Sequence, residues 1–401
     1  MNLFAEYHKK FLVLLKEIQK KNLIIIPDKF NNFTVELPPK DQLADISTNI
    51  AMLLAKHNKK NPIDLANLLK SDFINNFEEF EKIEIAKPGF INIKFRTDFW
   101  RDYIIKIVKF NKKFGSNSNL CKKFNIEFVS ANPTGPLHVG HCRGAIIGDV
   151  LSNLLKFNGH SVTKEYYVND YGNQIKSFVD SVYHRILEIK EATPFPTDKN
   201  LYPGEYIIDI AKKIIEKNTT LNFKLKEDIY EILEKNSLNF SIEMIKANLA
   251  SIGVIHDKFI YESSLITSNE VEKTIKNLTN SNFVYKGKLS APKGELTDNW
   301  KPREQLLFKS TSFGDDTDRA LQKEDNTWTY FAGDLAYHSN KINRNYDFLI
   351  NILGADHAGY IKRIVSGVKA LSNDKTKLIC KVSQLVKLFK NGQPFKMSKR
   401  K

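Results

Sequence analysis

The sequence is poor in cysteine, and its few cysteines lie far apart. Only Cys121, Cys142 and Cys380 occur among 401 residues, and no C-x-x-C pair is present. This pattern excludes a disulfide framework and a cysteine-based zinc site, and it indicates a reducing compartment. Arginine is scarce as well, since only nine of the 61 basic residues are arginine.

Long apolar runs are also missing. The short apolar stretch near the N-terminus is interrupted by Lys16 and Glu17, so it predicts an amphipathic helix and no signal peptide. No apolar span of about 18 residues, the length that begins to cross a bilayer, is present. The chain has no internal repeat. We therefore predict a cytoplasmic protein without membrane contact.

The charge balance is basic. Lys+Arg 61 against Asp+Glu 46 gives a formal charge of +15, and the hydrophobic content of 42% is enough for a sizeable core. A positive excess favours a polyanionic partner such as nucleic acid, although a general lysine bias has the same effect on composition. Seven basic residues and no acidic residue lie within residues 381–401.

The first 110 residues predict a small α+β domain. Apolar spacing separates helical segments from short β-rich runs, and the polar segment 111–119 predicts a linker. The predicted elements are helices over 1–20, 41–56 and 62–69, and strands over 23–27, 33–37 and 83–95, the last folded back at a Pro-Gly turn.

From residue 125 the pattern becomes that of a parallel sheet. A strand (NIEFV), a helix and a second strand at 161–168 follow one another within about 45 residues, as in a βαβ unit. The helix is predicted to present one apolar face. That face consists of Ile146, Val150, Leu154 and Phe157. Further predicted elements are helices over 173–190, 204–218 and 224–252, which form an insertion, and strands over 328–332 and 347–354.

The run HVGH at residues 138–141 begins the first of these helices directly after a strand. Positions i and i+3 of a first helical turn lie on one face, so His138 and His141 can point at one ligand. The helix N-terminus adds free N–H groups and a positive dipole end, which suit a phosphate. Gly140 lets a nucleotide approach the backbone. A pair of capping histidines, or half of a metal site, is the alternative.

A second motif, KMSKR at residues 396–400, lies in the basic C-terminal stretch. Two lysines three residues apart beside a serine suit a mobile loop that holds a triphosphate. Taken alone, the pentamer also fits a solvated charge run or a patch like a nuclear-import signal. The pairing of both motifs in one chain favours the nucleotide interpretation.

Together the two motifs resemble the HIGH and KMSKS signatures of class I aminoacyl-tRNA synthetases. Within that class the chain is similar to the bacterial-type arginyl-tRNA synthetases. The stretches that carry this resemblance are VSANPTGPLHVGHCRGAIIGD at 129–149, EYYVNDYGNQI at 165–175, YPGEYI at 202–207, TSFGDDTDR at 311–319, TYFAGDLAYHSNKI at 329–342 and NILGADHAGYIKR at 351–363. In addition, ELPPKDQLADISTNIAMLLAK at 36–56 and IAKPGFIN at 85–92 resemble that family's additional tRNA-binding domain.

The resemblance implies an α/β fold. We expect an α+β tRNA-binding domain over residues 1–110 and a Rossmann-like parallel-sheet catalytic domain over 111–401, with a helical insertion at about 176–260. Family members continue past the second motif into an all-helical anticodon-binding domain. This chain ends at Lys401, so we expect a C-terminally truncated fragment whose own activity is an open question.

The resemblance also implies the reaction: ATP-dependent ligation of L-arginine to tRNA(Arg) through an arginyl-adenylate. The expected substrates and partners are L-arginine, ATP with Mg²⁺, and tRNA(Arg), with no zinc and with a monomeric enzyme. The implied catalytic residues are His138, His141, Lys396 and Lys399. The implied ATP-binding residues are Ala131, Asn132, Pro133, Thr134, Gly135, Pro136, Leu137, His138, Val139, Gly140, His141, Lys396, Met397, Ser398, Lys399 and Arg400.

Arginine is expected to bind to acidic and polar side chains, because a guanidinium has five donors and no acceptor. The implied arginine-binding residues are Glu127, Asn132, Tyr330, Asp334 and His357, the last chosen over Asp356 by register. We further expect Asn169, Asp170 and Gln174 to line the same cavity. Two alternatives remain: a class I synthetase for another amino acid, and a catalytically dead RNA-binding module, which has no need of both phosphate motifs.

Overall fold

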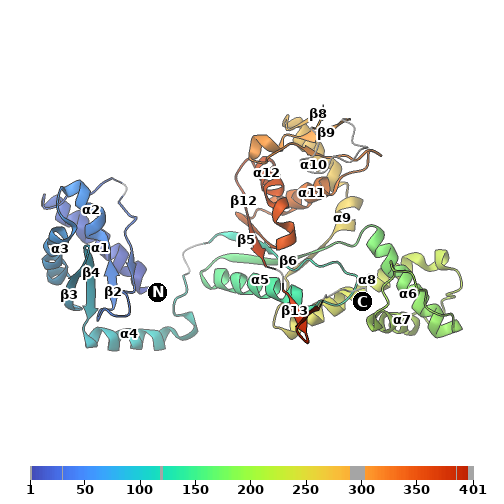
Figure 1. Cartoon of the computed structure of the whole chain (residues 1–401), viewed down its shortest axis with the longest axis horizontal. Coiled ribbons are helices and arrows are strands. Elements are labelled where there is room, and N and C mark those ends of the chain that lie inside the picture. The colour runs from blue at the N-terminus through green and yellow to red at the C-terminus, as the bar shows by residue number, and fades with distance from the viewer. Residues whose placement is uncertain (1, 29, 118–120, 290–302, 385, 396–401) are drawn as a thin grey trace. The chain divides into compact units, whose positions relative to one another are not determined.

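The structure is a computed structural model, and it describes residues 2–28, 30–117, 121–289, 303–384 and 386–395. The chain divides into two compact units, Met1–Asn117 and Ser118–Lys401, which are taken separately below (Figure 1). Within the described ranges, every helix is too short or too polar to span a membrane.

The first unit is an antiparallel sheet covered by helices, with the strand order β1-β2-β4-β3. The helix α1 shows why its sequence folds this way: Tyr7, Phe11, Leu14 and Ile18 recur at helical spacing and are buried, and the Asn2 side chain caps its first turn. The elements are α1 (Leu3–Lys20), β1 (Val35–Glu36), β2 (Ile46–Thr48), α2 (Ile50–Asn58), α3 (Pro62–Asn76), β3 (Phe80–Ala86), β4 (Phe90–Phe95), α4 (Thr97–Phe110) and the 3₁₀ turn η1 (Asn111–Lys113).

Two of the elements predicted for this unit are wrong. Residues 23–27 form a loop, in which both backbone polar groups of Ile25 bond to the Asn58 side chain and so need no strand partner. The helix predicted over 41–56 begins only at Ile50. The residues before it form β2, whose Ser47 lies opposite Asn92 of β4 and donates to its side chain at 2.6 Å. The helix that opens on Pro62 and the strand pair over 83–95 are confirmed.

The second unit is built on a five-stranded parallel sheet in the order β12-β11-β5-β6-β7. The chain reverses its winding direction at the neighbouring strands β5 and β11, and ligands bind beyond the carboxyl ends of the strands at such a point. The strands are β5 (Lys123–Glu127), β6 (Ser161–Val168), β7 (Lys258–Tyr261), β11 (Phe348–Gly354) and β12 (Lys377–Ser383).

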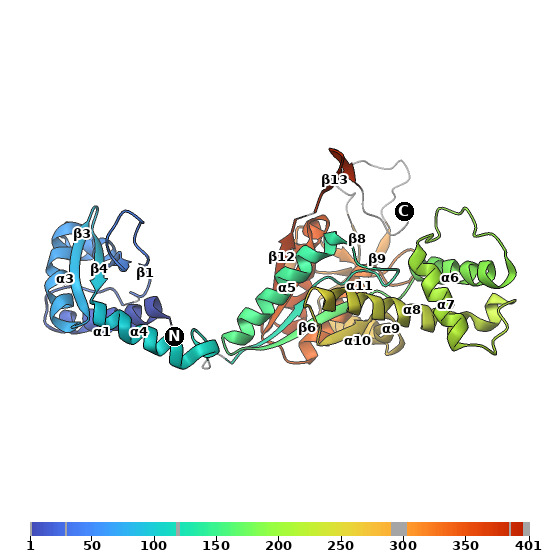
Figure 2. The ribbon, with the colours of Figure 1, turned by 90° about the horizontal axis from the view of Figure 1, so that it is seen from below.

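The helix α5 (Val139–Phe157) connects β5 to β6, and the face that it turns to the sheet is opposite the predicted apolar face. Ile146, Val150, Leu154 and Phe157 are all exposed. The buried side consists of small residues, and a Cβ on Gly148 would lie 2.2 Å from Cγ of Phe128. The helix therefore contacts the sheet through residues that allow a close approach. Figure 2 shows α5 running alongside the strands.

Helices α6 (Asn173–Glu191), α7 (Glu205–Lys217) and α8 (Lys226–Ser251) lie between β6 and β7 in the chain. They share an apolar core of their own, which is centred on Phe178, Ile210 and Leu233. Figure 1 shows them grouped in green to yellow, apart from the orange helices. This is the helical insertion that the periodicity of the sequence indicated.

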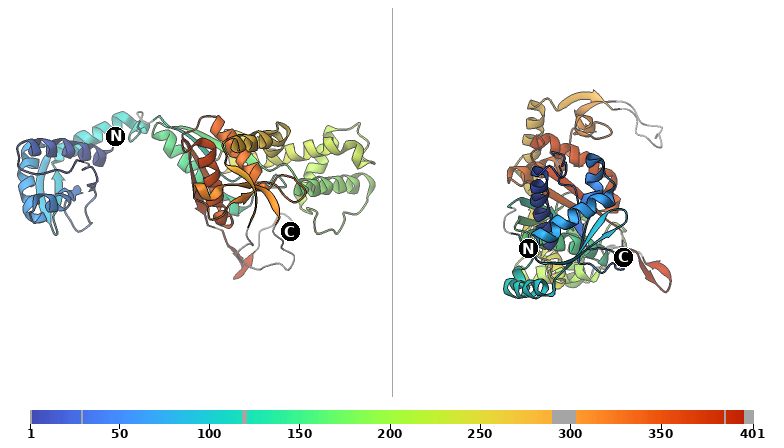
Figure 3. Two further views of the ribbon diagram at one scale, coloured as in Figure 1. Left: turned by 90° about the horizontal axis from the view of Figure 1, so that it is seen from above. Right: turned by 90° about the vertical axis from the view of Figure 1, so that its left-hand side faces the viewer.

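The remaining elements form a smaller antiparallel sheet packed with helices. The strand predicted over 328–332 is wrong, because Thr329 caps α11 there with its side chain. The elements are α9 (Glu262–Thr267), α10 (Glu270–Asn280), β8 (Val284–Lys288), β9 (Glu304–Phe308), η2 (Ser310–Phe313), β10 (Arg319–Ala320), α11 (Tyr330–Asn343), η3 (Ala355–Tyr360) and α12 (Ile361–Ser372). A hairpin of β13 (Leu388–Lys390) and β14 (Gln393–Phe395) stands out from this unit in Figures 2 and 3.

Candidate active site

The loop between β5 and α5 leaves the carboxyl edge of the parallel sheet in a strained conformation. Val129 has φ +69° and Ser130 has φ +41°, and a β-branched residue is rarely found in this left-handed region. Strain of this kind persists only where the surroundings impose it, and it is concentrated at functional sites.

Side chains from distant parts of the unit hold this loop in place. The Tyr166 hydroxyl donates to the carbonyl of Ala131 at 2.7 Å, and the Tyr206 hydroxyl donates to the carbonyl of Thr134 at 3.0 Å. The N–H of Leu137 donates to Asn248 of α8 at 3.1 Å. The loop that was predicted to bind ATP is therefore anchored by both the sheet and the helical insertion.

The two histidines of the HVGH run lie together, as their spacing predicts. His138 caps α5, and its ring stacks on that of His141 with 3.9 Å between ring centroids. The backbone N–H of His138 donates to Nδ1 of His141 at 3.2 Å. A cavity of about 260 Å³ lies beside this turn and is lined also by Asn248 and Ile252. Both imidazoles thus stand at the positive end of the helix.

The charges of four carboxylates act on the Tyr167 side chain at the carboxyl edge of the sheet. Burial is the main reason that the pKa of Tyr167 lies far above its usual value, and the charges of Glu262, Asp334, Glu127 and Asp170 raise it further. The four come from β5, the segment after β6, the start of α9, and α11. A cluster of negative charge at one partly buried point suits a cationic ligand.

Glu262 is the member of this cluster that the sequence did not reveal. It is the first residue of α9, directly after β7. Burial raises its pKa to about 7, and the charges of Asp334 and Asp170 add to the effect. Its position directly after a parallel strand is the only sequence signal for it. That signal required β7 to be recognised as a neighbour of β6.

Asp334 lies on α11, partly buried, where it accepts a hydrogen bond from the Tyr360 hydroxyl. Burial raises its pKa to about 6, and the nearby Glu127 raises it too, whereas Lys341 and His357 act in the opposite direction. A partly buried carboxyl whose pKa is raised toward neutrality is typical of a functional site. Tyr360 was another residue that sequence reasoning missed.

Three other predicted arginine-binding residues, Tyr330, His357 and Asn132, lie outside the group of four carboxylates. Tyr330 begins α11 and its side chain is 81% exposed, with Nζ of Lys323 at 5.6 Å from the ring centroid. His357 is exposed on η3 and lies 3.5 Å from a carboxylate oxygen of Asp356. Asn132 donates to the Gln174 side chain at 2.6 Å, so these two predicted neighbours are in contact.

Glu127 already has a buried cationic partner. Nζ of Lys341 lies 2.5 Å from its Oε2, and the Lys341 side chain is fully buried. The other oxygen, Oε1, accepts a hydrogen bond from Ser130 at 3.1 Å. Asp170 is also satisfied, by the backbone and hydroxyl of Ser263 at 2.9 and 2.6 Å.

The second motif, Lys396 to Arg400, lies outside the described residues. Within those residues, no cluster of histidine, cysteine and carboxylate side chains is arranged to hold a metal ion. The acidic run of TSFGDDTDR has structural partners instead: Asp315 forms a bidentate pair with Arg319 at 2.7 and 2.8 Å, and Asp318 caps Thr311.

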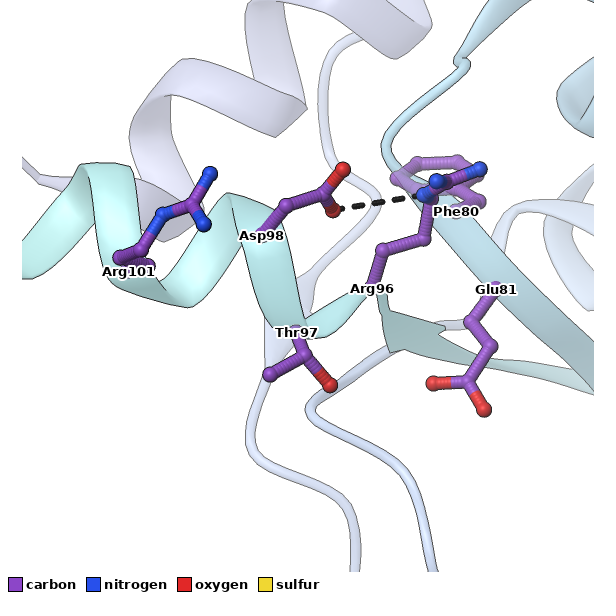
Figure 4. A pocket seen from close by; sticks show the side chains of 6 residues that line it. All are labelled: Phe80, Glu81, Arg96, Thr97, Asp98 and Arg101. Atoms are coloured by element: carbon purple, nitrogen blue, oxygen red, sulfur yellow. Dashed lines mark hydrogen bonds and ion pairs between the residues drawn. The ribbon is translucent and has the colours of Figure 1, made fainter.

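The first unit has a hollow of its own, of about 610 Å³, where β3 meets the start of α4 (Figure 4). It is lined by Phe80, Glu81, Arg96, Asp98 and Arg101, together with Thr97. Nε of Arg96 donates to Asp98 at 3.3 Å. Two of the nine arginines of the chain therefore line this surface hollow, together with two carboxylates.

Two family models match this chain. Residues 9–95 match the arginyl tRNA synthetase N-terminal domain, and residues 104–400 match the catalytic domain of class I tRNA synthetases of the arginine type. The chain belongs to the arginyl-tRNA synthetase family. The predicted family and fold class are thereby confirmed.

Relatives within the arginyl-tRNA synthetases align along the whole chain. An arginine–tRNA ligase of Pelagibacter ubique is 57% identical over 100% of this chain and 70% of its own length, and one of Wolbachia pipientis from Culex pipiens is 44% identical over 100% and 69%. A Campylobacter jejuni structure titled as an arginyl-tRNA synthetase has a TM-score of 0.64 and 32% identity, and the match covers 75% of this chain. The match spans 62% of that solved chain. The Thermus thermophilus enzyme, at 18% identity and a TM-score of 0.64, shares the fold.

Proposed function

We propose that the chain performs the reaction of its family, the ATP-dependent ligation of L-arginine to tRNA(Arg). The observation that carries the proposal is that the charges of four carboxylates act on Tyr167, whose backbone N–H donates to Ser130 in the turn that leads to the HVGH helix. This group of carboxylates suits the guanidinium of arginine, since a planar cation with five donors binds best to several acceptors.

In this proposal the arginine side chain binds chiefly to Asp334 and Glu262. Both are partly buried, and burial and neighbouring carboxylates raise the pKa of each above its usual value. Glu127 contributes less directly, because Lys341 already neutralises it. The remaining proposed contacts are Asn132 in the loop after β5, Tyr330 at the start of α11 and His357 on η3.

ATP is proposed to bind along the anchored loop and the HVGH turn. His138 and His141 contact its phosphates, with the adenine over Gly140 and the loop residues from Ala131 to Leu137 along the nucleotide. Lys396 and Lys399, with Met397, Ser398 and Arg400, hold the leaving pyrophosphate. Mg²⁺ enters as part of the MgATP substrate, and no zinc is involved.

The proposed chemistry has two steps. The arginine carboxylate attacks the α-phosphorus of ATP, the bond to pyrophosphate breaks, and arginyl-adenylate forms. A hydroxyl of the 3′-terminal adenosine of tRNA then attacks the acyl carbon, and AMP leaves. Negative charge builds on the phosphates in the first step. Positioning and electrostatic stabilisation by the helix N-terminus, the histidines and the lysines are therefore the main contributions.

We also propose that the first unit, Met1–Asn117, binds tRNA. Arg96 and Arg101 in the hollow of Figure 4 supply exposed guanidinium groups for phosphate contacts. Replacing Arg101 by Glu is then expected to weaken tRNA binding and to reduce its dependence on salt. The working enzyme is proposed to be a cytoplasmic monomer.

Arginine-dependent exchange of pyrophosphate into ATP, measured with tRNA(Arg) present, tests the proposed function. We expect exchange with arginine and none with lysine, citrulline or other amino acids. Replacing Asp334 by Asn is expected to raise the KM for arginine and leave that for ATP close to the wild-type value. Exchange driven by a different amino acid would contradict the arginine assignment. RNA binding with no ATP binding would instead indicate an RNA-binding module.

A further inference from the structure

The helix α11 packs on the parallel sheet through polar side chains, which is unusual for a buried helix face. Its outer side is apolar, and Phe331, Leu335 and Ala336 belong to a core shared with α10 and α12. The side toward the sheet carries buried Tyr337, His338 and Lys341, followed by Arg344 just beyond the helix end. Apolar residues would pack at such an interface at least as stably, so the polar set calls for another explanation.

Lys341 is a fully buried charge in this interface, with a side-chain exposure of 0%. Its Nζ lies 2.5 Å from Oε2 of Glu127 on β5 and 3.3 Å from Oδ1 of Asn351 on β11. It also lies 4.3 Å from the centroid of the Tyr337 ring. Burying an ammonium is costly unless it is paired, and the pairing here is directional and reaches two strands.

The ion pair continues into the strained turn of the ATP loop. Oε1 of Glu127 accepts from the Ser130 hydroxyl at 3.1 Å, and the same hydroxyl accepts from the N–H of Tyr167 at 3.0 Å. Within this turn, Val129 and Ser130 have backbone angles in the left-handed region. A row of contacts therefore leads from α11 through Lys341 and Glu127 to the start of the loop that approaches the HVGH helix.

We propose that Lys341 is a positioning residue that acts through Glu127 and Ser130 to hold this strained turn in register with α11. The inference rests on the proposed function, because α11 carries Asp334 for arginine and the turn leads to the ATP-binding loop. Lys341 itself touches no substrate, since it is fully buried. Its role is to fix the distance between the two subsites, on which the attack of one substrate on the other depends.

Two variants break the row at different points. Lys341→Met removes the ammonium and keeps most of the apolar side chain, whereas Ser130→Ala removes the hydroxyl link and leaves the buried ion pair intact. We expect each to lower kcat/KM for arginine-dependent exchange about tenfold or more. We expect the double variant to be no worse than the poorer single variant, because both changes break one row of contacts. Ser130→Ala keeps the test possible if Lys341→Met does not fold.

Lys164→Met is the matched control. Lys164 is also a buried lysine, and it forms a 2.5 Å pair with Asp149 of α5 in the same unit. We expect it to lower the melting temperature as Lys341→Met does, while kcat/KM stays within about twofold of wild type. A loss of stability alone would affect both lysine variants alike, so the difference between them isolates positioning from folding.

Hydrogen–deuterium exchange supplies a readout that does not depend on catalysis. We expect peptides that cover residues 128–131 to exchange faster in Lys341→Met and in Ser130→Ala, and at the wild-type rate in Lys164→Met. Unchanged exchange in this turn, or single-variant losses of kcat/KM that multiply in the double variant, would overturn the positioning role. If the wild-type protein shows no arginine-dependent exchange of pyrophosphate into ATP, the proposed function is contradicted instead. Hydrogen–deuterium exchange of the turn would still report on the role of Lys341.

Discussion

The raised pKa values of Glu262 and Asp334 predict that arginine binding weakens as the pH falls. In the folded protein these pKa values are about 7 and about 6, because burial and neighbouring carboxylates disfavour the charged forms. Asp170 faces Glu262, and Glu127, Lys341 and His357 face Asp334. A guanidinium stays protonated throughout this range and binds the ionised carboxylates, so a protonated pocket must release its protons before it binds.

The magnitude follows from the two values. At pH 8 about nine pockets in ten have both carboxylates ionised, and at pH 6 only about one in twenty does. The dissociation constant for arginine is therefore expected to rise about twentyfold from pH 8 to pH 6, which corresponds to about 1.8 kcal/mol. Near pH 6.5, binding should release about one proton in total.

Isothermal titration calorimetry tests this directly, in two buffers that differ in ionisation enthalpy, so that proton release is measured together with affinity. Glu262→Gln leaves only Asp334 to titrate, and its residual affinity is expected to change only about twofold over the same range. Proton uptake on binding, or a dissociation constant that is the same at pH 6 and pH 8, would refute the reasoning. The thermal unfolding of the free protein should be followed in parallel to show that it stays folded at pH 6.

Three further predictions concern stability. Glu262→Gln is expected to raise the melting temperature at pH 8, because the raised pKa means that this charge destabilises the fold once the pH exceeds the unfolded value of about 4.3; an unchanged or lower melting temperature would contradict it. Gly148→Ala is expected to cost about 1–3 kcal/mol in urea unfolding, since the new Cβ would meet the Phe128 ring at 2.2 Å. Asp315→Asn is expected to lower the melting temperature at pH 7, because Arg319 holds the pKa of Asp315 at about 2. In the wild-type protein, the stabilisation that the Asp315–Arg319 pair supplies should persist above pH 4 and disappear as the pH falls toward 2. The variant should lack this pH dependence.

Patterns that depend on neighbouring residues were predicted well from the sequence. The periodicity of α1, the Pro62 start of α3 and the strand–loop–helix context of His138 and His141 all appear in the structure. Failures occurred where tertiary contacts override local preference. The apolar run at 23–27 satisfies its backbone through Asn58 and forms no strand, and α5 packs through Gly148 rather than through its apolar face.

The candidate site shows the same division. Family motifs identified Asp334, Glu127 and the HVGH turn, because those residues stand in recognisable runs. Glu262 escaped notice because nothing in its local sequence sets it apart. It belongs to the site only because β7 pairs with β6, which brings Glu262 close enough for the charge of Asp334 to raise its pKa. The partnership of Lys341 with Glu127 spans 214 positions and was equally invisible.

By itself, therefore, the sequence determined the family, the parallel-sheet architecture and the position of the HVGH turn at the start of α5, since each depends on short runs whose spacing sets the local geometry. Only the tertiary structure decided which carboxylates remain available to a guanidinium and which are already neutralised. It also decided that the buried Lys341 is linked through Glu127 to the strained loop. Charge pairing and desolvation depend on distances in space between residues far apart in the chain, and no local pattern encodes those distances.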